Sequence, residues 1–249
     1  METIAFINQK GGVAKTTTVA AVGAELRRRG YRVLFVDLDA QRSLSSIMRA
    51  GADGITAYEV LKGVAPATQA VQATEQGDII AAAKGLVAEN LMEKRVGREY
   101  RLKKALEPLQ GAYDYCLIDC PPALSIITYN ALTAATGCII PCQADILSLE
   151  ALDDLQETVA DIREYSNTGL NICGVAITRY SDRAILSKDL ATLIERKAAE
   201  MGTKVYNTRI REGIAIKEAQ AMREDIFSYA PKSNAAADYK ALTSEILEG

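Results

Sequence analysis

The residues best suited to chemistry lie near the N-terminus, where Gly11 and Gly12 are followed by Lys15 and Thr16. The segment separates a short apolar run from an amphipathic one, so we expect it to connect a strand to a helix. Backbone N–H groups at a helix N-terminus bind anions, and glycines allow phosphates to approach the chain closely. The lysine can reach the β and γ phosphates of a nucleotide, and the threonine hydroxyl can ligate Mg²⁺. The residues predicted to bind the nucleotide here are Gly11, Gly12, Val13, Ala14, Lys15, Thr16 and Thr17.

The loop departs from the usual phosphate-loop pattern, G-x-x-x-x-G-K-[ST], at two positions. Gln9 stands in place of the first glycine, and Ala14 stands directly before the lysine. A glycine-rich turn that binds no ligand is the alternative interpretation. The succession of strand, glycine pair, Lys-Thr pair and helix favours phosphate binding.

Acidic residues follow two of the apolar runs. Asp119 ends the run YDYCLID, while Asp37 and Asp39 come after RVLFV. Open α/β sheets bind ligands at the carboxyl ends of their strands. We therefore expect Asp119 to hold Mg²⁺ through a water molecule, opposite Thr16, with Asp37 in a supporting role. If the strand continues, Asp37 and Asp39 point to the same side, because residues two apart share a face. A helix cap or a turn is the alternative role for such aspartates.

These residues need elements to position them, and the chain alternates short apolar with longer amphipathic segments. Strands are predicted at 3–7, 32–37, 78–82, 113–119, 136–141 and 171–178. Helices are predicted at 16–29, 98–109, 124–134, 146–166 and 184–201. Continuous apolar strands alternating with helices indicate a parallel sheet that is covered on both sides. The predicted fold class is α/β, a doubly wound, mostly parallel sheet with helices on both faces.

One domain spanning 1–249 is predicted, because no Pro-, Gly- or Ser-rich linker and no internal repeat interrupts the pattern. Residues 40–97 are the least regular stretch, and we interpret them as an elaboration of that domain. The first predicted strand begins almost at Met1, so no N-terminal helix-turn-helix module is expected.

Composition limits the possible functions. The chain has 249 residues, with 29 Lys and Arg against 32 Asp and Glu, and 49% of its residues are hydrophobic. These values exclude disordered, collagen-like and coiled-coil classes. The chain has no histidine, which excludes Ser-His-Asp and Cys-His catalysis and any His-ligated zinc. The sequence shows neither a secretory signal nor an apolar run long enough to span a membrane, so we expect a cytoplasmic protein.

Five cysteines raise the question of a metal cluster, because Cys116 and Cys120, like Cys138 and Cys142, are four residues apart. However, Cys116, Cys138 and Cys173 lie in or beside apolar, strand-like runs. Free cysteine is commonly a small buried hydrophobe. Buried thiols are therefore favoured over a metal site.

Lys10 extends the loop into K-G-G-x-x-K-T-T, the signature of the deviant Walker A group. With it, the chain resembles the ParA/Soj family of DNA-partitioning ATPases, relatives of the MinD cell-division ATPases that share the P-loop NTPase fold. The resemblance spans nearly the whole chain. It is carried by NQKGGVAKTTT, VLFVDLDAQ, REYRLKKAL, YDYCLIDCPP, the TRYSDR region, and IREGIAIKEAQ through YAPKSNAAADY.

The resemblance implies an enzyme that binds ATP with Mg²⁺ and hydrolyses ATP slowly, under stimulation by a partner protein. The catalytic residues that it implies are Lys10, Lys15 and Asp39. Lys10 would reach across an ATP-dependent homodimer to the phosphates of the other copy, and Asp39 would position the attacking water. Positioning and charge neutralisation supply most of the catalysis in such a reaction. Hydrolysis would then depend on dimerisation.

The same resemblance places the adenine contacts near the end of the strand 171–178 and in a later loop. The matching residues are Thr178, Arg179, Ile210 and Arg211. The later loop reads Ile210-Arg211-Glu212, which departs from the Pro-Arg that is commoner in the family.

Binding of DNA would need local positive charge, because the formal charge of the whole chain is −3. Residues 171–232 carry eleven Lys and Arg against eight acidic residues, and 84–104 carry seven against three. In the family, basic residues displayed by the ATP-bound dimer bind DNA non-specifically. Arg183 matches one such position, whereas Ala215 occupies another where arginine is expected. The substitutes that the sequence offers are Lys188, Arg209, Arg211, Lys217 and Arg223. A solvated face of mixed charge is the alternative.

The resemblance further implies a nucleoid-associated protein that partitions plasmid, chromosome or mobile-element DNA with a ParB-type centromere-binding partner. A MinD-like membrane ATPase is the main alternative, but its basic amphipathic tail is not matched by the sequence ADYKALTSEILEG. The P-loop fold would also suit a cluster protein such as the nitrogenase iron protein, or a small-molecule ligase.

Overall fold

The computed structural model describes residues 1–86, 96–181 and 185–249. Within these ranges the strands form a seven-stranded sheet in the order β3-β4-β2-β5-β1-β6-β7. Their bounds are β1 Glu2–Phe6, β2 Val33–Asp37, β3 Val71–Thr74, β4 Gly77–Ile80, β5 Tyr115–Asp119, β6 Gly137–Gln143 and β7 Asn171–Thr178. Neighbouring strands are parallel, except that β3 runs antiparallel to β4. The predicted α/β fold with a mostly parallel sheet is confirmed.

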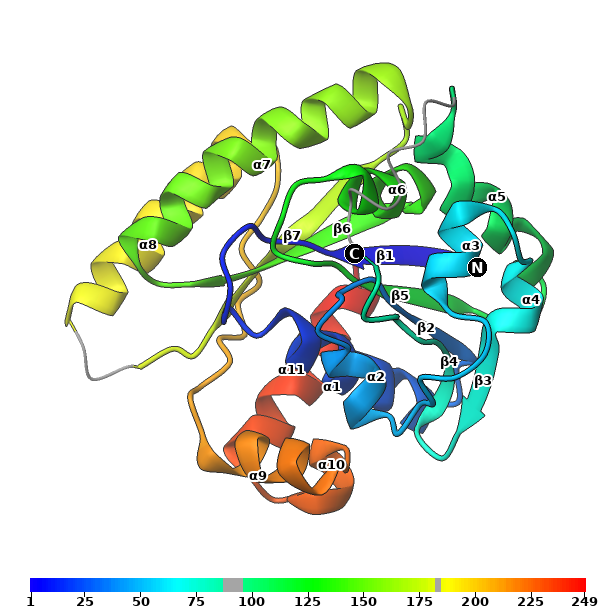
Figure 1. Ribbon diagram of the computed structural model, residues 1–249. Coiled ribbons are helices and arrows are strands. Elements are labelled where there is room, and N and C mark those ends of the chain that lie inside the picture. The colour runs from blue at the N-terminus through cyan, green and yellow to red at the C-terminus, as the bar shows by residue number, and fades with distance from the viewer. Residues whose placement is uncertain (87–95, 182–184) are drawn as a thin grey trace.

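Helices cover both faces of the sheet (Figure 1). One face carries α3 (Ala57–Lys62), α4 (Ala67–Ala70), α5 (Arg101–Leu106), α6 (Ile126–Ala134), α7 (Ile146–Tyr165) and α8 (Ile185–Glu200). The other face carries α1 (Lys15–Arg28), α2 (Ser43–Ile47), α9 (Ile214–Met222), α10 (Ile226–Tyr229) and α11 (Asn234–Leu247). Successive strand residues point to opposite faces, so Ile118 packs with the first set and Leu117 with the second.

The main difference from the sequence-based elements concerns the predicted helix 98–109. It begins as a 3-10 turn at Arg98–Tyr100, continues as α5 and ends in a second 3-10 turn at Glu107–Leu109. Pro108 explains the break, because it lacks the N–H that a continuous helix needs. The patterns did not predict β3, α9 or α11. The described part of the irregular stretch, 40–86 with 96–97, contains three short helices and the β3–β4 hairpin, which extends the edge of the sheet.

The carboxyl ends of the central strands lie at one edge of the sheet. Asp119 at the end of β5 is paired with Asp37 at the end of β2, and Gln143 at the end of β6 is paired with Thr178 at the end of β7. Helix α1 starts at Lys15, shortly after β1, so its N-terminus lies at the same edge. Open α/β sheets bind ligands at this position.

Candidate active site

An open cavity of about 650 Å³ lies over the N-terminus of α1. The phosphate loop forms one wall, and the loop at 210–213 and α9 form another. The predicted site residues that line the cavity are Gly11, Gly12, Ala14, Lys15, Thr16, Thr17, Asp39, Thr178, Arg179, Ile210, Arg211 and Lys217. Lys10 and Val13 are not part of this lining, and the side chain of Val13 is buried. The structure thus brings residues from several distant segments to one cavity.

The backbone of the phosphate loop is held in a left-handed conformation at two residues. Gly12 has a φ of 78°, and Ala14, which precedes the first turn of α1, has a φ of 64°. Glycine adopts this conformation readily, whereas a Cβ atom makes it less favourable by about 1 kcal/mol. Ala14 therefore takes the conformation that glycine supplies in the usual pattern, at a cost in backbone energy.

Lys15 folds back over its own loop. Its ammonium group donates hydrogen bonds to the carbonyl oxygens of Asn8 (2.8 Å) and Lys10 (3.0 Å). Burial lowers the pKa of Lys15, although the nearby carboxylates, chiefly Asp119, act in the opposite direction. A phosphate beside this ammonium group would stabilise its charged form, so the site is suited to an anion.

Asp119 is completely buried beneath the loop. Its Oδ2 accepts a hydrogen bond from the Thr16 hydroxyl at 2.7 Å, whereas its Oδ1 has no hydrogen-bond partner among the described residues. Burial raises the pKa of Asp119 well above its ordinary value, and the neighbouring Asp37 adds to the rise. Mg²⁺ prefers oxygen ligands and keeps several of its waters. A hydroxyl beside a buried, unpartnered carboxylate oxygen therefore fits the predicted magnesium site.

Asp37 is also buried, but it is not part of the cavity lining. Its Oδ2 accepts hydrogen bonds from the Ser45 N–H (2.8 Å) and hydroxyl (2.7 Å), and its Oδ1 accepts one from the Asp39 N–H (3.1 Å). Strand β2 ends at Asp37, so the strand continuation that would place both carboxylates on one face does not occur. Asp37 instead shapes the turn that presents Asp39 to the cavity.

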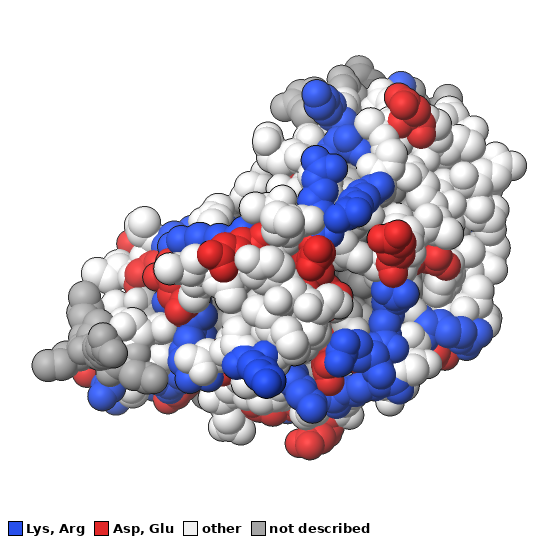
Figure 2. Space-filling model, turned by 90° about the horizontal axis from the view of Figure 1, so that it is seen from below, with Lys and Arg blue, Asp and Glu red and all other residues white. Residues whose placement is uncertain are grey.

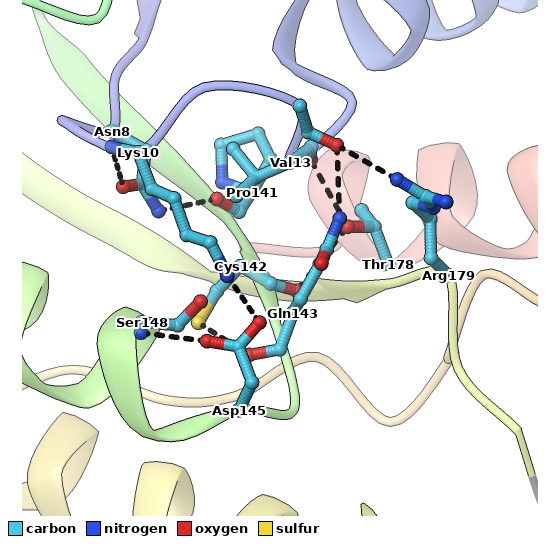
Figure 3. A network of polar contacts seen from close by, with 11 residues as sticks. Asn8, Lys10, Val13, Pro141, Cys142, Gln143, Asp145, Ser148, Thr178 and Arg179 are labelled. Carbon is cyan, nitrogen blue, oxygen red and sulfur yellow. Dashed lines mark hydrogen bonds and ion pairs between the residues drawn. The ribbon is translucent and has the colours of Figure 1, made fainter.

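The Lys10 side chain extends toward Asp145 at the N-terminus of α7 (Figure 3). Its ammonium group contacts the carboxylate of Asp145, which caps this helix by accepting a hydrogen bond from the Ser148 N–H at 2.9 Å. The Lys10 N–H donates to the side-chain oxygen of Asn8 at 2.9 Å. Within one chain, the ammonium group of Lys15 is therefore bound to carbonyl oxygens of the phosphate loop, whereas that of Lys10 is bound to a carboxylate outside the loop.

The predicted adenine residues surround the far side of the cavity, and two of them form ion pairs. Arg179 binds Glu212 at 2.9 Å, and Arg211 binds both carboxylate oxygens of Asp238, at 3.0 and 2.5 Å. The hydroxyl of Thr178 is buried and bound to backbone oxygens.

The polar residues near the loop that were not predicted as site residues include Gln220, Gln143 and Asp145. Gln220 donates a hydrogen bond to the Thr17 hydroxyl at 2.8 Å, but it lies on α9, which the sequence patterns did not reveal. Gln143 and Asp145 lie at the end of β6 and directly before α7. Their position after a predicted strand is the signal that could have identified them, since it is the one that identified Asp119.

The residues predicted for DNA contact have unequal surroundings. Arg209 is paired with Glu195 at 2.9 Å and lies over the Tyr180 ring. Figure 2 shows several groups of Lys and Arg side chains on the lower face, with acidic residues between them. Arg183 lies outside the described residues. The predicted residues with exposed side chains are Lys188, Lys217 and Arg223.

The cysteines are free thiols, and all but Cys173 are buried. Burial raises the pKa of Cys116 and of Cys142 to about 12, which keeps these thiols protonated at neutral pH. The interpretation as small core side chains is confirmed for the four buried cysteines, whereas Cys173 is only partly buried and packs against the core.

Among the described residues, the helices include none that is both long enough and apolar enough to cross a membrane.

Comparison with known proteins places the chain in a family. Residues 1–172 match the family of AAA domains. The chromosome partitioning protein ParA of Caulobacter vibrioides is 36% identical over 254 residues, which cover 99% of this chain and 94% of that protein. The sporulation initiation inhibitor protein Soj of Bacillus subtilis is 39% identical over 249 residues, which cover 98% and 97% of the two chains.

Solved structures share the fold and include nucleotide complexes. The structure of cobyrinic acid a,c-diamide synthase from Mycobacterium smegmatis with bound ADP and magnesium has a TM-score of 0.86 and 34% identity. The match covers 100% of this chain and 94% of that one. The cell-division ATPase MinD of Pyrococcus furiosus has a TM-score of 0.78 and 25% identity, covering 99% and 98% of the chains. The phosphate loop, together with 36% identity to ParA and 39% identity to Soj over nearly the whole chain, shows that the chain belongs to the ParA/Soj family of P-loop ATPases, which use ATP with Mg²⁺.

Proposed function

We propose that this ATPase is a dimerising switch that binds DNA non-specifically when ATP is bound and releases it after hydrolysis. In this role it would partition plasmid, chromosome or mobile-element DNA together with a ParB-type partner, in the cytoplasm and on the nucleoid. The observation that carries the proposal is Lys10, the lysine that the phosphate loop has in addition to Lys15. The chain that contains it matches ParA and Soj over nearly its full length.

Hydrolysis is proposed to occur by in-line attack of water on the γ-phosphate. The loop N–H groups and Lys15 would hold the β and γ phosphates, and Asp39 would orient the water from the turn that Asp37 shapes. Thr16 and Asp119 would hold Mg²⁺, which neutralises negative charge on the phosphate oxygens when it is bound. No other covalent chemistry is required of the protein, because phosphoryl transfer depends mainly on positioning and electrostatic stabilisation.

Lys10 is proposed to complete the site of a second copy. In the single chain its ammonium group is bound to Asp145, outside the lining of the cavity. To reach phosphates across a dimer interface, it must leave this carboxylate. Assembly and catalysis would therefore be linked through one side chain, and ATP would favour the dimer until hydrolysis removes the γ-phosphate.

DNA contact is proposed for the exposed cations Lys188, Lys217 and Arg223, together with Arg183. The exposure of Lys188 and Arg223, for which no acidic partner is found among the described residues, supports the proposal, because a phosphate backbone is bound by accessible positive charge rather than by charge already neutralised. Lys217, Arg209 and Arg211 are weaker candidates, since each has an acidic partner in the chain: Glu212 lies 3.7 Å from Lys217, Glu195 pairs with Arg209 and Asp238 with Arg211. Stimulation of hydrolysis by the ParB-type partner would then release the DNA.

Co-sedimentation with DNA in the presence of ADP, ATP or a non-hydrolysable ATP analogue tests this function. We expect retention with ATP and with the analogue, and no retention with ADP. The Lys15→Ala variant, which loses the phosphate-binding ammonium group, should remain in the supernatant under all three conditions. Retention that is independent of the nucleotide, or no retention at low salt, would contradict the proposal.

A further inference from the structure

The phosphate loop is bound through its carbonyl oxygens by groups from other parts of the chain. The Gly12 oxygen accepts a hydrogen bond from Gln143 Nε2 at 2.9 Å, and the Val13 oxygen accepts one from the Thr178 hydroxyl at 3.0 Å. The Ala14 oxygen accepts bonds from the N–H (2.9 Å) and hydroxyl (2.8 Å) of Thr18. Three successive carbonyl groups of the loop are therefore held in fixed directions.

Two of these donors come from the ends of neighbouring strands. Gln143 is the last residue of β6 and Thr178 is the last residue of β7, and they are directly paired in the sheet. Figure 3 shows both side chains extending from the strand ends toward the loop at Val13. A rigid pair of parallel strands thus presents two donors to two consecutive peptide groups.

The direction of a carbonyl determines the direction of the next N–H. A trans peptide group is planar, and its C=O and N–H point to opposite sides. When the sheet binds the Gly12 and Val13 oxygens, the N–H groups of Val13 and Ala14 are turned away from the strand ends. N–H groups presented in this way form the anion-binding part of a phosphate loop.

We propose that Gln143 and Thr178 are positioning residues that hold the phosphate loop in its phosphate-binding conformation. The loop needs such support, because Ala14 has the left-handed φ of 64° and strained residues persist only where their surroundings fix them. The proposal depends on ATP binding by the loop and not on the proposed role in DNA partitioning. It also gives Thr178 a role through the loop, in place of the adenine contact expected from the sequence.

Thr178 allows an almost isosteric test. Its side chain is completely buried, and its hydroxyl lies 3.0 Å from the Val13 oxygen and 3.2 Å from the Cys142 oxygen. Thr178→Val keeps the shape and removes the donor, whereas Thr178→Ser keeps the donor. Thr203→Val is the matched control, because the Thr203 hydroxyl donates to the Ile172 oxygen at 2.7 Å, at the opposite end of β7.

The measurement is the affinity for ADP with Mg²⁺, by titration calorimetry, with urea unfolding of each nucleotide-free variant. ADP is used so that dimerisation does not contribute. Thr178→Val should weaken ADP binding by about tenfold, whereas Thr178→Ser should remain within about twofold of the original chain. Thr203→Val should lose a comparable amount of stability and bind ADP normally. Equal affinities of the Thr178→Val and Thr203→Val variants would overturn the proposal.

Gln143 keeps the proposal testable if Thr178→Val fails to fold. Gln143→Met has a similar length but no donor, and the side chain is only half-buried, so folding should be preserved. We expect it to weaken ADP binding by about threefold or more. If Thr178→Val does fold, the double variant with Gln143→Met provides a further test. The losses of ADP-binding free energy of the two single variants should not be additive in it, because both donors fix adjacent peptide groups. Unchanged ADP affinity of Gln143→Met would contradict the proposal.

Discussion

Lys10 is bound through its ammonium group to Asp145, the residue that caps α7. Burial of Asp145 acts to raise its pKa, but the hydrogen bonds from Lys10 and from Ser148 outweigh it, and the pKa is lowered. Asp145 therefore remains charged at neutral pH, and its ion pair with Lys10 is maintained there. A lysine proposed to act on the phosphates of a second copy is thus restrained within its own chain.

Asp145→Asn should release this restraint without removing the helix cap, because asparagine caps as well as aspartate. A partly exposed ion pair contributes at most about 1 kcal/mol. The ATP concentration that gives half-maximal dimerisation should therefore fall by about two- to fivefold. Light scattering during an ATP titration measures this value. If Asp145→Asn needs as much ATP as the original chain, or more, the contact does not restrain Lys10.

Ala14→Gly should stabilise the protein, because glycine adopts a φ of 64° without the Cβ penalty. We expect the free energy of unfolding to rise by about 1 kcal/mol in urea titrations. Ala20→Gly is the matched control, since it places glycine inside α1 and should lower the same free energy by about 1 kcal/mol. A destabilised Ala14→Gly variant would show that this alanine is held by favourable packing rather than in a strained conformation.

The raised pKa of Asp119 predicts a pH dependence of the nucleotide-free protein. The folded chain binds a proton at Asp119 more readily than the unfolded chain does, so the free energy of unfolding falls as pH rises above the ordinary aspartate pKa. Asp119→Asn does not titrate, and it keeps an acceptor for the Thr16 hydroxyl. The Asp119→Asn variant should be more stable than the original chain at neutral pH, and its stability should depend less on pH. Urea unfolding at several pH values measures both effects.

Asp114 provides a control of opposite sign for this pH experiment. Hydrogen bonds from Arg32 lower the pKa of Asp114 to about 2, so its stabilising effect is present above the ordinary aspartate pKa and is lost only as pH falls toward 2. Asp114→Asn should therefore lower stability throughout the neutral range. If Asp119→Asn also lowered the stability at neutral pH, the buried charge of Asp119 would not be destabilising.

Exposed and paired cations should differ in their effect on DNA affinity. Reversing Lys188 and Arg223 to glutamate should weaken ATP-dependent DNA binding by about tenfold or more at low salt and reduce the salt dependence. Arg209→Gln should change the DNA affinity little, because Arg209 already has an acidic partner in Glu195. Fluorescence anisotropy with a labelled duplex at several salt concentrations gives both quantities. An equal loss for Arg209→Gln would place the DNA elsewhere on the surface.

Local patterns predicted the parts of the fold in which one segment determines its own structure. The strand 171–178 and the helix beginning at Ile146 match because each is a long, continuous apolar or amphipathic run. The break at Pro108 could have been predicted from its missing N–H. Helix α11 also carried a signal, since Ser233 caps it and its apolar residues have helical spacing.

Contacts between distant segments could not be predicted in this way. Gln143 reaches Gly12, and Asp145 reaches Lys10, across more than a hundred residues of chain. The hydrophobic periodicity of a segment does not predict which side chains the end of its strand will contact once the sheet has formed. The phosphate loop was predictable because a short motif contains its chemistry, whereas the residues that hold the loop are determined by the order of the strands.

The central claim is that two copies enclose ATP and that each supplies Lys10 to the other. Sedimentation velocity of the original chain and of Lys10→Ala, with saturating ATP and Mg²⁺, tests it most directly. We predict that the original chain sediments as a dimer with ATP and as a monomer with ADP, while Lys10→Ala remains monomeric with either nucleotide. A Lys10→Ala chain that forms the same ATP-dependent dimer as the original chain would contradict the claim.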